Sequence, residues 1–191
     1  TEGFHREELE GFTGPGAMAL GRLELNDAKV PVDSRIGEEG DGFYQAMRTM
    51  NGSRLEIAAS SIGAARGALD RTIEYISERE TFGKPVKDRQ AVRHRIAEYE
   101  ARLEALRTFT YETARDLEEN VELAEEPAMA KLLAAQLAEE VASDAVQLHG
   151  GYGLLDEYLV EECLRWSKIA QIYDGTNEIM RGIIAESVLD E

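Results

Sequence analysis

Apolar residues recur every three or four positions along most of this chain, which is the spacing of one buried face of an α-helix. The clearest run passes through Met47, Leu55, Ile62 and Leu69. Breaks in the pattern delimit predicted helices over residues 43–78, 88–119, 127–148, 157–170 and 176–189. Long helices with short connections are typical of an antiparallel bundle. The third helix is apolar on most of its circumference, so we expect it at the centre.

The first 40 residues show a different pattern, of loops and short strands. Residues 19–25 alternate imperfectly between apolar and polar side chains, and residues 28–32 follow as a second candidate strand. Two short strands do not make a stable sheet alone, so further strands are expected from another chain or from sequence outside this one. The expected fold is mainly α: a remnant of a β-domain over residues 1–40, then a helical bundle domain over residues 41–191. Turns are expected at Gly11, Gly14, Pro15 and Gly16.

Charge and composition exclude several classes of function. The net charge is −17, from 38 acidic and 21 basic residues, so binding to nucleic acid or to anionic membranes is not expected. Such an acidic, lysine-poor composition suits a salt-rich cytoplasm, where screening relieves self-repulsion, and we expect a halophilic source. Cys163 is the only cysteine, which excludes an internal disulfide, and no long apolar run suggests a membrane span. A soluble, cytoplasmic protein is the prediction.

The candidate chemistry centres on the sequence IYDGTNEIMR at residues 172–181, where one predicted helix ends and the last begins. Asp174 is either the N-cap of the last helix or a functional carboxylate. Gly175 removes a side chain beside it, so that a ligand could approach the backbone. His5, His94 and His149 are scattered and share no metal-ligand spacing with the cysteine, so no metal site is predicted.

Several stretches together resemble one family, the acyl-CoA dehydrogenases. The family's ER-x-x-FG-x-P…Q segment resembles RETFGKPV at residues 79–86, followed by Gln90. Its A-x-Q-x-x-GG-x-G segment resembles AVQLHGGYG at residues 145–153. Its IYEGT segment resembles IYDGT at residues 172–176. Val30-Pro31, the loop at 37–42 and Phe43 resemble the exit from the family's middle β-domain. The resemblance implies the end of that domain plus the complete C-terminal bundle, without the N-terminal helical domain.

The resemblance also implies FAD as cofactor. Arg79 and Thr81 correspond to contacts of the pyrophosphate, and Phe82 to a residue packed near the dinucleotide. The other implied contacts are Gln90 on the adenosine side, Gln147 and Gly151 against a neighbouring subunit's FAD, and Thr176. Simpler interpretations stay open: Arg79 could pair with Glu78 or Glu80, Gln90 could be solvated, and Gly151 could help end a helix.

By the same resemblance Asp174 matches the catalytic glutamate, one methylene shorter. Arg54, Tyr173 and Gly175 correspond to the substrate site. Some branches of the family place the base where this chain has Ser53, which cannot serve, and a nitroalkane-oxidising branch uses aspartate at the position of Asp174.

Three functions follow as alternatives. The first is FAD-dependent α,β-dehydrogenation of an acyl-CoA in fatty acid metabolism, with an electron-transfer flavoprotein-type acceptor. The second is nitroalkane oxidation, and the third is a non-catalytic assembly subunit of a split dehydrogenase. A homo-oligomer, specifically a tetramer built as a dimer of dimers, is implied.

Overall fold

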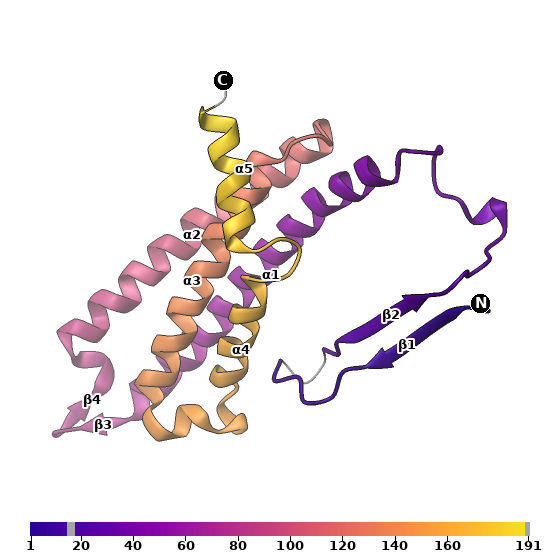
Figure 1. The fold of residues 1–191 in the computed structure, drawn as a ribbon. Helices are drawn as coiled ribbons and strands as arrows, with labels where there is room; N and C mark the ends of the chain where they lie inside the picture. The colour runs from indigo at the N-terminus through magenta and orange to yellow at the C-terminus, as the bar shows by residue number, and fades with distance from the viewer. Residues whose placement is uncertain (15–17, 190–191) are drawn as a thin grey trace.

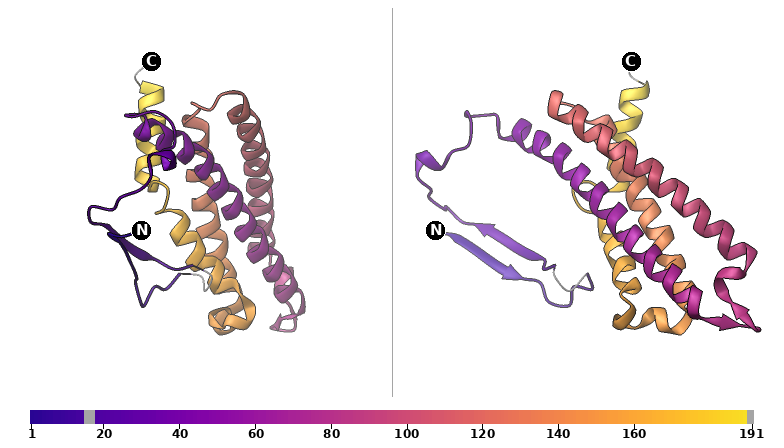
Figure 2. Two further views of the ribbon diagram at one scale, coloured as in Figure 1. Left: turned by 90° about the vertical axis from the view of Figure 1, so that its right-hand side faces the viewer. Right: turned by 180° about the vertical axis from the view of Figure 1, so that it is seen from behind.

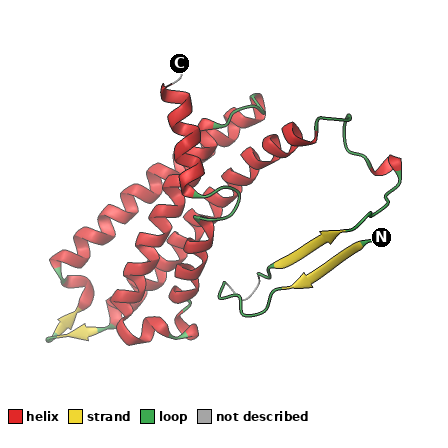
Figure 3. Ribbon diagram, in the orientation of Figure 1, coloured by secondary structure: helices red, strands yellow, loops and turns green. Residues whose placement is uncertain are grey.

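A computed structural model describes residues 1–14 and 18–189, and within them the chain forms an antiparallel helical bundle preceded by a two-stranded hairpin (Figure 1, Figure 3). The predicted fold class is confirmed. The predicted turn positions Pro15 and Gly16 lie outside the described residues. In the described part the α-helices are α1 (Gly42–Glu78), α2 (Gln90–Glu119), α3 (Glu125–His149), α4 (Val160–Ala170) and α5 (Asn177–Leu189).

Helix α3 lies at the centre of the bundle, as its apolar circumference predicts. It packs most extensively against α1 and also contacts α2, α4 and α5 (Figure 2). Its contribution to the core is rich in alanine, which allows neighbouring helices to approach closely, and larger side chains fill the remaining space. The main buried cluster contains Ala65, Ala68, Leu69, Tyr99, Leu103, Leu137, Ala138, Val141, Ala145 and Val160.

The start of α3 differs from the prediction. The helix begins at Glu125 rather than at Pro127, which becomes its third residue. Proline is tolerated there because the first N–H groups of a helix have no partner within it. Glu125 and Glu126 therefore belong to the first turn, where their charges interact favourably with the helix dipole.

The strands near the N-terminus are not the predicted pair. Strand β1 (Phe4–Glu8) pairs antiparallel with β2 (Gly21–Leu25), with Phe4 opposite Leu25. Residues 28–32 form no strand, and a short 3₁₀ helix (Val32–Ser34) follows instead. Pro31 removes a donor that a ladder needs, whereas the polar sequence of β1 gave little sign that it could pair.

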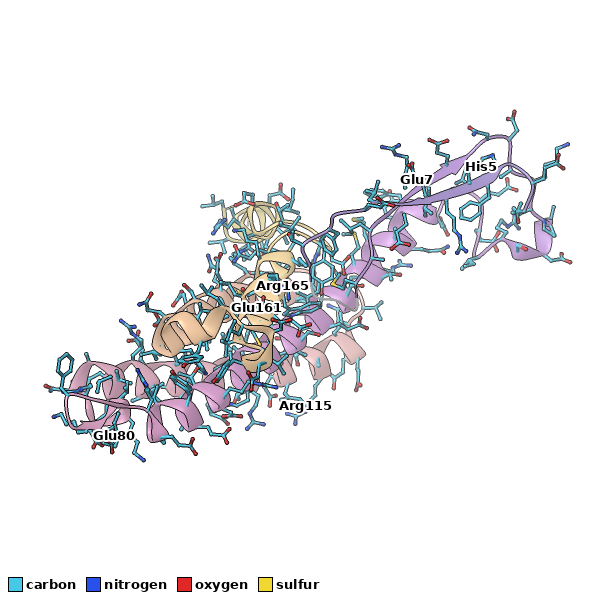
Figure 4. The ribbon with its side chains drawn as sticks, turned by 90° about the horizontal axis from the view of Figure 1, so that it is seen from below. His5, Glu7, Glu80, Arg115, Glu161 and Arg165 are labelled. Carbon is cyan, nitrogen blue, oxygen red and sulfur yellow. The ribbon has the colours of Figure 1, made fainter. Side chains whose placement is uncertain are left out.

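The hairpin of β1 and β2 stands away from the bundle. In Figure 4, His5 and Glu7 lie at one end of the molecule and Glu80 at the other. Every residue of both strands is exposed, including Leu23 and Leu25. A direct link runs through Arg165 of α4, whose guanidinium donates to the Gly14 carbonyl at 2.8 Å.

A tight hairpin connects α1 to α2. Strands β3 (Glu80–Thr81) and β4 (Lys84–Pro85) pair around Phe82 and Gly83, both of which have positive φ. A 3₁₀ turn (Val86–Asp88) then leads into α2. At the far end of α3, two further 3₁₀ turns (Gly150–Leu154 and Asp156–Tyr158) lead into α4. No helix in the described part is long and apolar enough to cross a membrane.

Candidate active site and cofactor cleft

A cleft of about 470 Å³ lies where the β3–β4 hairpin meets the end of α3, and we call it the end cleft. Four of the residues predicted to bind cofactor line it: Arg79, Thr81, Gln147 and Gly151. They come from segments almost seventy positions apart in the sequence, which the antiparallel packing of α1 and α3 brings together. The remaining lining residues are Tyr75, Val86, Leu148, His149, Gly150, Tyr152 and Leu155.

The chemistry of the end cleft suits a phosphate-containing ligand. Among the described residues, Arg79 forms no ion pair with Glu78 or Glu80, so the simpler interpretation of this arginine does not hold. A Cβ at Gly150 or Gly151 would meet no atom within 4 Å, so a ligand can reach the backbone on that side. A guanidinium and an accessible backbone are what an anionic dinucleotide requires.

His149 is one of the residues that line the end cleft. Its side chain is 3% exposed and stacks on Tyr75 with ring centroids 4.3 Å apart. Its Nδ1 lies 2.7 Å from the Ala145 carbonyl, which fixes the ring orientation. Burial lowers the pKa of His149, although the bond to Ala145 opposes this shift. The imidazole of His149 is therefore packed against its neighbours and uncharged at neutral pH.

The other predicted cofactor residues lie outside the end cleft. Phe82 is at the tip of the β3–β4 hairpin, 98% exposed, with φ of +51°. Gln90, the first residue of α2, is also exposed. Arg89, which the sequence did not single out, donates to the Thr81 carbonyl and lies 5.7 Å from the centroid of the Phe82 ring. It therefore holds the hairpin and its exposed aromatic ring in place.

Asp174 occupies the turn between α4 and α5, together with Tyr173 and Gly175. Asp174 has φ of +51° and Gly175 of +101°, so two successive residues take left-handed conformations. Tyr173 packs on Ile57, Ala135 and Ala170, and its ring lies 6.0 Å from that of Trp166. Asp174 is half-buried at this turn.

Asp174 is not the N-cap of α5. Thr176 has that role: its Oγ1 accepts from the Ile179 N–H at 3.4 Å, and its carbonyl accepts from the Met180 N–H at 3.0 Å. The capping interpretation of Asp174 is therefore wrong, because α5 begins three residues after it. Thr176, predicted to contact the cofactor, has a structural role that the sequence analysis missed.

Two buried cations lie near Asp174. Arg54 of α1 is 5% exposed and donates to Asn51 Oδ1 at 2.8 Å. Its Nε is buried without a hydrogen-bond partner among the described residues. Burial lowers the pKa of Arg54, and the charge of Asp174 opposes this. The second cation, Lys131 of α3, is fully buried.

Sequence reasoning missed Lys131. Its Nζ donates to the Gly175 carbonyl at 2.7 Å and to Asn177 Oδ1 at 3.3 Å. The available indication was a lone lysine among the alanines and leucines of the helix predicted to be central. Because a buried ammonium needs partners, such a lysine points to a polar segment packed on that helix.

The end cleft and the Asp174 turn are separate sites on one chain. Arg54 and Arg79 both belong to the α1 region, and an α-helix rises about 1.5 Å per residue, so they are roughly 37 Å apart. The structure thus divides the predicted residues between two ends of the bundle. Among the described residues no three His, Cys, Asp or Glu side chains gather as a metal site would require.

Most of the residues on which the family resemblance rests lie at these two sites. Comparison with known proteins decides whether the chain belongs to that family. The model of the acyl-CoA dehydrogenase C-terminal domain matches residues 40–189. The chain belongs to the acyl-CoA dehydrogenase family. Among curated relatives, it is 37% identical over 189 residues to subunit CarC of the caffeyl-CoA reductase–Etf complex of Acetobacterium woodii, covering 99% of this chain and 50% of that one.

Other relatives give the same result. The chain is 40% identical to mitochondrial isobutyryl-CoA dehydrogenase of Bos taurus, over 100% of this chain and 46% of the relative. The solved structure of butyryl-CoA dehydrogenase from Megasphaera elsdenii superposes with a TM-score of 0.93 at 36% identity, covering 99% of this chain and 49% of that one. The chain thus spans about half the length of the relatives that it matches.

Proposed function

We propose that the protein takes part in FAD-dependent α,β-dehydrogenation of an acyl-CoA thioester, with Asp174 as the base. The observation that carries the proposal is that the half-buried Asp174 interacts electrostatically with two buried cations, Arg54 and Lys131, in a member of this family. A carboxylate held within reach of the substrate is the group that can accept the α proton.

The residues of the Asp174 turn divide the work of the reaction. Asp174 takes the α proton, which the thioester carbonyl acidifies. The guanidinium of Arg54 supplies positive charge near the place of the substrate carbonyl. Tyr173 shields the site from water, and Gly175 lets the acyl chain approach the backbone. FAD, when bound, would accept the hydride that leaves the β carbon.

In our proposal the end cleft and the Asp174 turn bind different parts of FAD. The FAD bound in the end cleft belongs to the active site of a second copy of the chain. Arg79 binds the pyrophosphate, Thr81 and Gln147 donate hydrogen bonds, and the backbone at Gly151 lies against the dinucleotide. The exposed ring of Phe82 and the exposed Gln90 serve the same ligand from outside the cleft. The separation of roughly 37 Å between Arg54 and Arg79 supports this division between two copies. In this proposal Thr176 contacts the cofactor in addition to its role as the N-cap of α5.

The proposal extends to the whole assembly. Residues 1–40 belong to a middle β-domain, which the exposed apolar side chains of the first hairpin support, and residues 41–191 form the C-terminal domain. Shared FAD sites imply a homo-oligomer, which we propose to be a tetramer in the cytoplasm, engaged in fatty acid metabolism. The relation to the Etf-complex subunit of Acetobacterium woodii supports an electron-transfer flavoprotein-type acceptor.

Aspartate at position 174 is the one observation that favours a second reaction, nitroalkane oxidation. Both reactions begin with removal of a proton from an acidified carbon, so the base alone does not distinguish them. The acyl-CoA names of the relatives favour the thioester. A non-catalytic assembly subunit would need neither a partly buried carboxylate nor buried cations near it.

Flavin bleaching by substrate tests the proposal. The full-length or reconstituted flavin-bound protein is mixed anaerobically with short-chain acyl-CoA esters or with primary nitroalkanes. Acyl-CoA should bleach the visible flavin band, and nitroalkanes should not. Bleaching by nitroalkane alone would establish the second reaction, and bleaching by neither would leave only the assembly role.

A further inference from the structure

Lys131 is the one fully buried lysine among the described residues of this chain, and the proposed reaction gives it no chemical step. It sits on the central helix α3 between Ala130 and Ala134, which are themselves buried. Removing an ammonium group from water costs several kcal/mol unless the protein supplies partners. A lysine in an alanine-lined core therefore needs hydrogen-bond partners for its ammonium group.

Its partners are in the turn that carries Asp174. The Nζ of Lys131 donates to the Gly175 carbonyl at 2.7 Å and to the side chain of Asn177, which is 4% exposed, at 3.3 Å. These two acceptors flank Thr176, the N-cap of α5. One amine therefore ties the central helix to the residue after Asp174 and to the first residue of α5.

The turn needs such a tie. Left-handed backbone at Asp174 costs free energy that the surroundings must offset, whereas Gly175 takes a positive φ without steric cost. Burial lowers the pKa of Lys131 to about 8. The negative charges of Asp174 and Glu178 oppose this shift, and the positive charge of Arg54 adds to it. The ammonium thus interacts electrostatically with the carboxylate of Asp174 and binds the backbone carbonyl of the next residue, Gly175.

We propose that Lys131 is a positioning residue for Asp174: by binding the Gly175 carbonyl and Asn177 it fixes the turn that aims the carboxylate. We call these two hydrogen bonds of Lys131 the clamp. The effect of the clamp on catalysis rests on the proposed function, whereas the clamp itself does not. Without the clamp, the turn should open locally, and the carboxylate should lose both its fixed place and a neighbouring positive charge. Two independent measurements follow.

The first measurement is hydrogen–deuterium exchange of the flavin-bound full-length protein, comparing Lys131→Met with the matched control Lys168→Met. Lys168 is an exposed lysine of α4, 3.6 Å from Glu139. Lys131→Met should raise exchange in residues 172–180 by about tenfold or more and leave α1 and α2 unchanged, and Lys168→Met should change neither. Unchanged exchange at the turn, or a uniform rise across the bundle, would overturn the clamp.

The second measurement is the pH profile of flavin reduction by acyl-CoA in the same variants. Misplacing the base should lower the limiting rate about 10- to 100-fold, with little change in substrate affinity. A normal rate in Lys131→Met would refute the positioning role. If the unmutated protein is not reduced at all, the proposed function fails, and exchange still decides the clamp.

Asn177→Ala provides a second variant if Lys131→Met does not fold. It removes one acceptor and leaves both the lysine and the Gly175 carbonyl in place. Exchange at the turn should rise by a smaller factor than in Lys131→Met, and the rate should fall less. Exchange identical to that of the unmutated protein in Asn177→Ala would count against the clamp.

Discussion

Gly175 shows how a single residue sets the geometry of the candidate active site. Its φ of +101° is a conformation that other residues rarely adopt, and a Cβ there would lie 2.8 Å from Met180 Cε. The methionine end can move, so the backbone conformation is the stronger constraint. Glycine is therefore required for the turn itself, in addition to any approach of substrate.

Gly175→Ala should lower the free energy of unfolding by about 1–3 kcal/mol. The matched control is Gly182→Ala, in the middle of α5, where a Cβ meets nothing within 4 Å. Because alanine is the better helix former, that change should stabilise the protein by up to about 1 kcal/mol. Denaturant unfolding of both variants measures the difference. Equal effects would mean that the turn is not strained.

His149 makes a separate prediction about pH. Its pKa lies below the ordinary value of 6.5 in the folded protein, because burial disfavours the imidazolium. As pH falls through 6.5 the unfolded chain takes up this proton first, so stability present at neutral pH is lost toward acid. His149→Phe keeps an aromatic ring beside Tyr75 but cannot titrate. Its unfolding free energy should therefore fall less between about pH 7.5 and about pH 5.5. An unchanged pH dependence would contradict the assignment.

At the scale of elements, α3 organises the molecule and α5 depends on it. Lys131 and Glu125 of α3 both contact the α5 region, the latter through Ser187. Helix α5 itself is short, buries only Asn177 and Met180 in the described part, and starts at the Thr176 cap. A short helix with little buried surface depends strongly on its cap.

Thr176→Ala should therefore cost about 1 kcal/mol of stability. Thr176→Ser keeps the hydroxyl and should stay within a few tenths of a kcal/mol of the unmutated protein. Thermal unfolding, together with exchange in α5, measures both. Equal stability of the alanine and serine variants would show that this cap contributes nothing.

The elements also show what could be read from the sequence. Period-3.6 apolar patterns placed every α-helix of the described part within about three residues, because burial against α3 enforces that period. The pairing of β1 with β2 escaped prediction because both strands are exposed and carry no burial pattern. The partners of Lys131 and the cap at Thr176 were not predicted from the sequence, because both depend on where the chain turns after Tyr173. The residues of the end cleft could be named only through family motifs, since long-range proximity has no local pattern.

At the scale of the whole molecule, acidity is the dominant feature. With a net charge of −17, the acidic side chains repel one another and destabilise the folded chain. Ion pairs such as that of Arg66 with Glu100, at 2.6 Å, stabilise it. Exposed pairs of this kind contribute about 0–1 kcal/mol each. Association into an oligomer would bring further like charges together.

Salt should therefore stabilise the protein. Raising potassium chloride from about 0.01 M to about 1 M shortens the screening length from roughly 30 Å to roughly 3 Å. Self-repulsion is weakened more than the ion pairs are, so we expect Tm to rise. Scanning calorimetry across this range measures it. A flat or falling Tm would remove the salt-adaptation hypothesis.

The central claim is that Asp174 is the base of an acyl-CoA dehydrogenation, and stopped-flow flavin reduction of Asp174→Asn tests it most directly. Asparagine tolerates the left-handed backbone at this position and keeps the shape of the side chain, but it cannot accept the α proton. In the full-length flavin-bound protein, reduction by acyl-CoA should slow by about 10²-fold or more, with flavin content unchanged. A near-normal rate in Asp174→Asn would contradict the assignment.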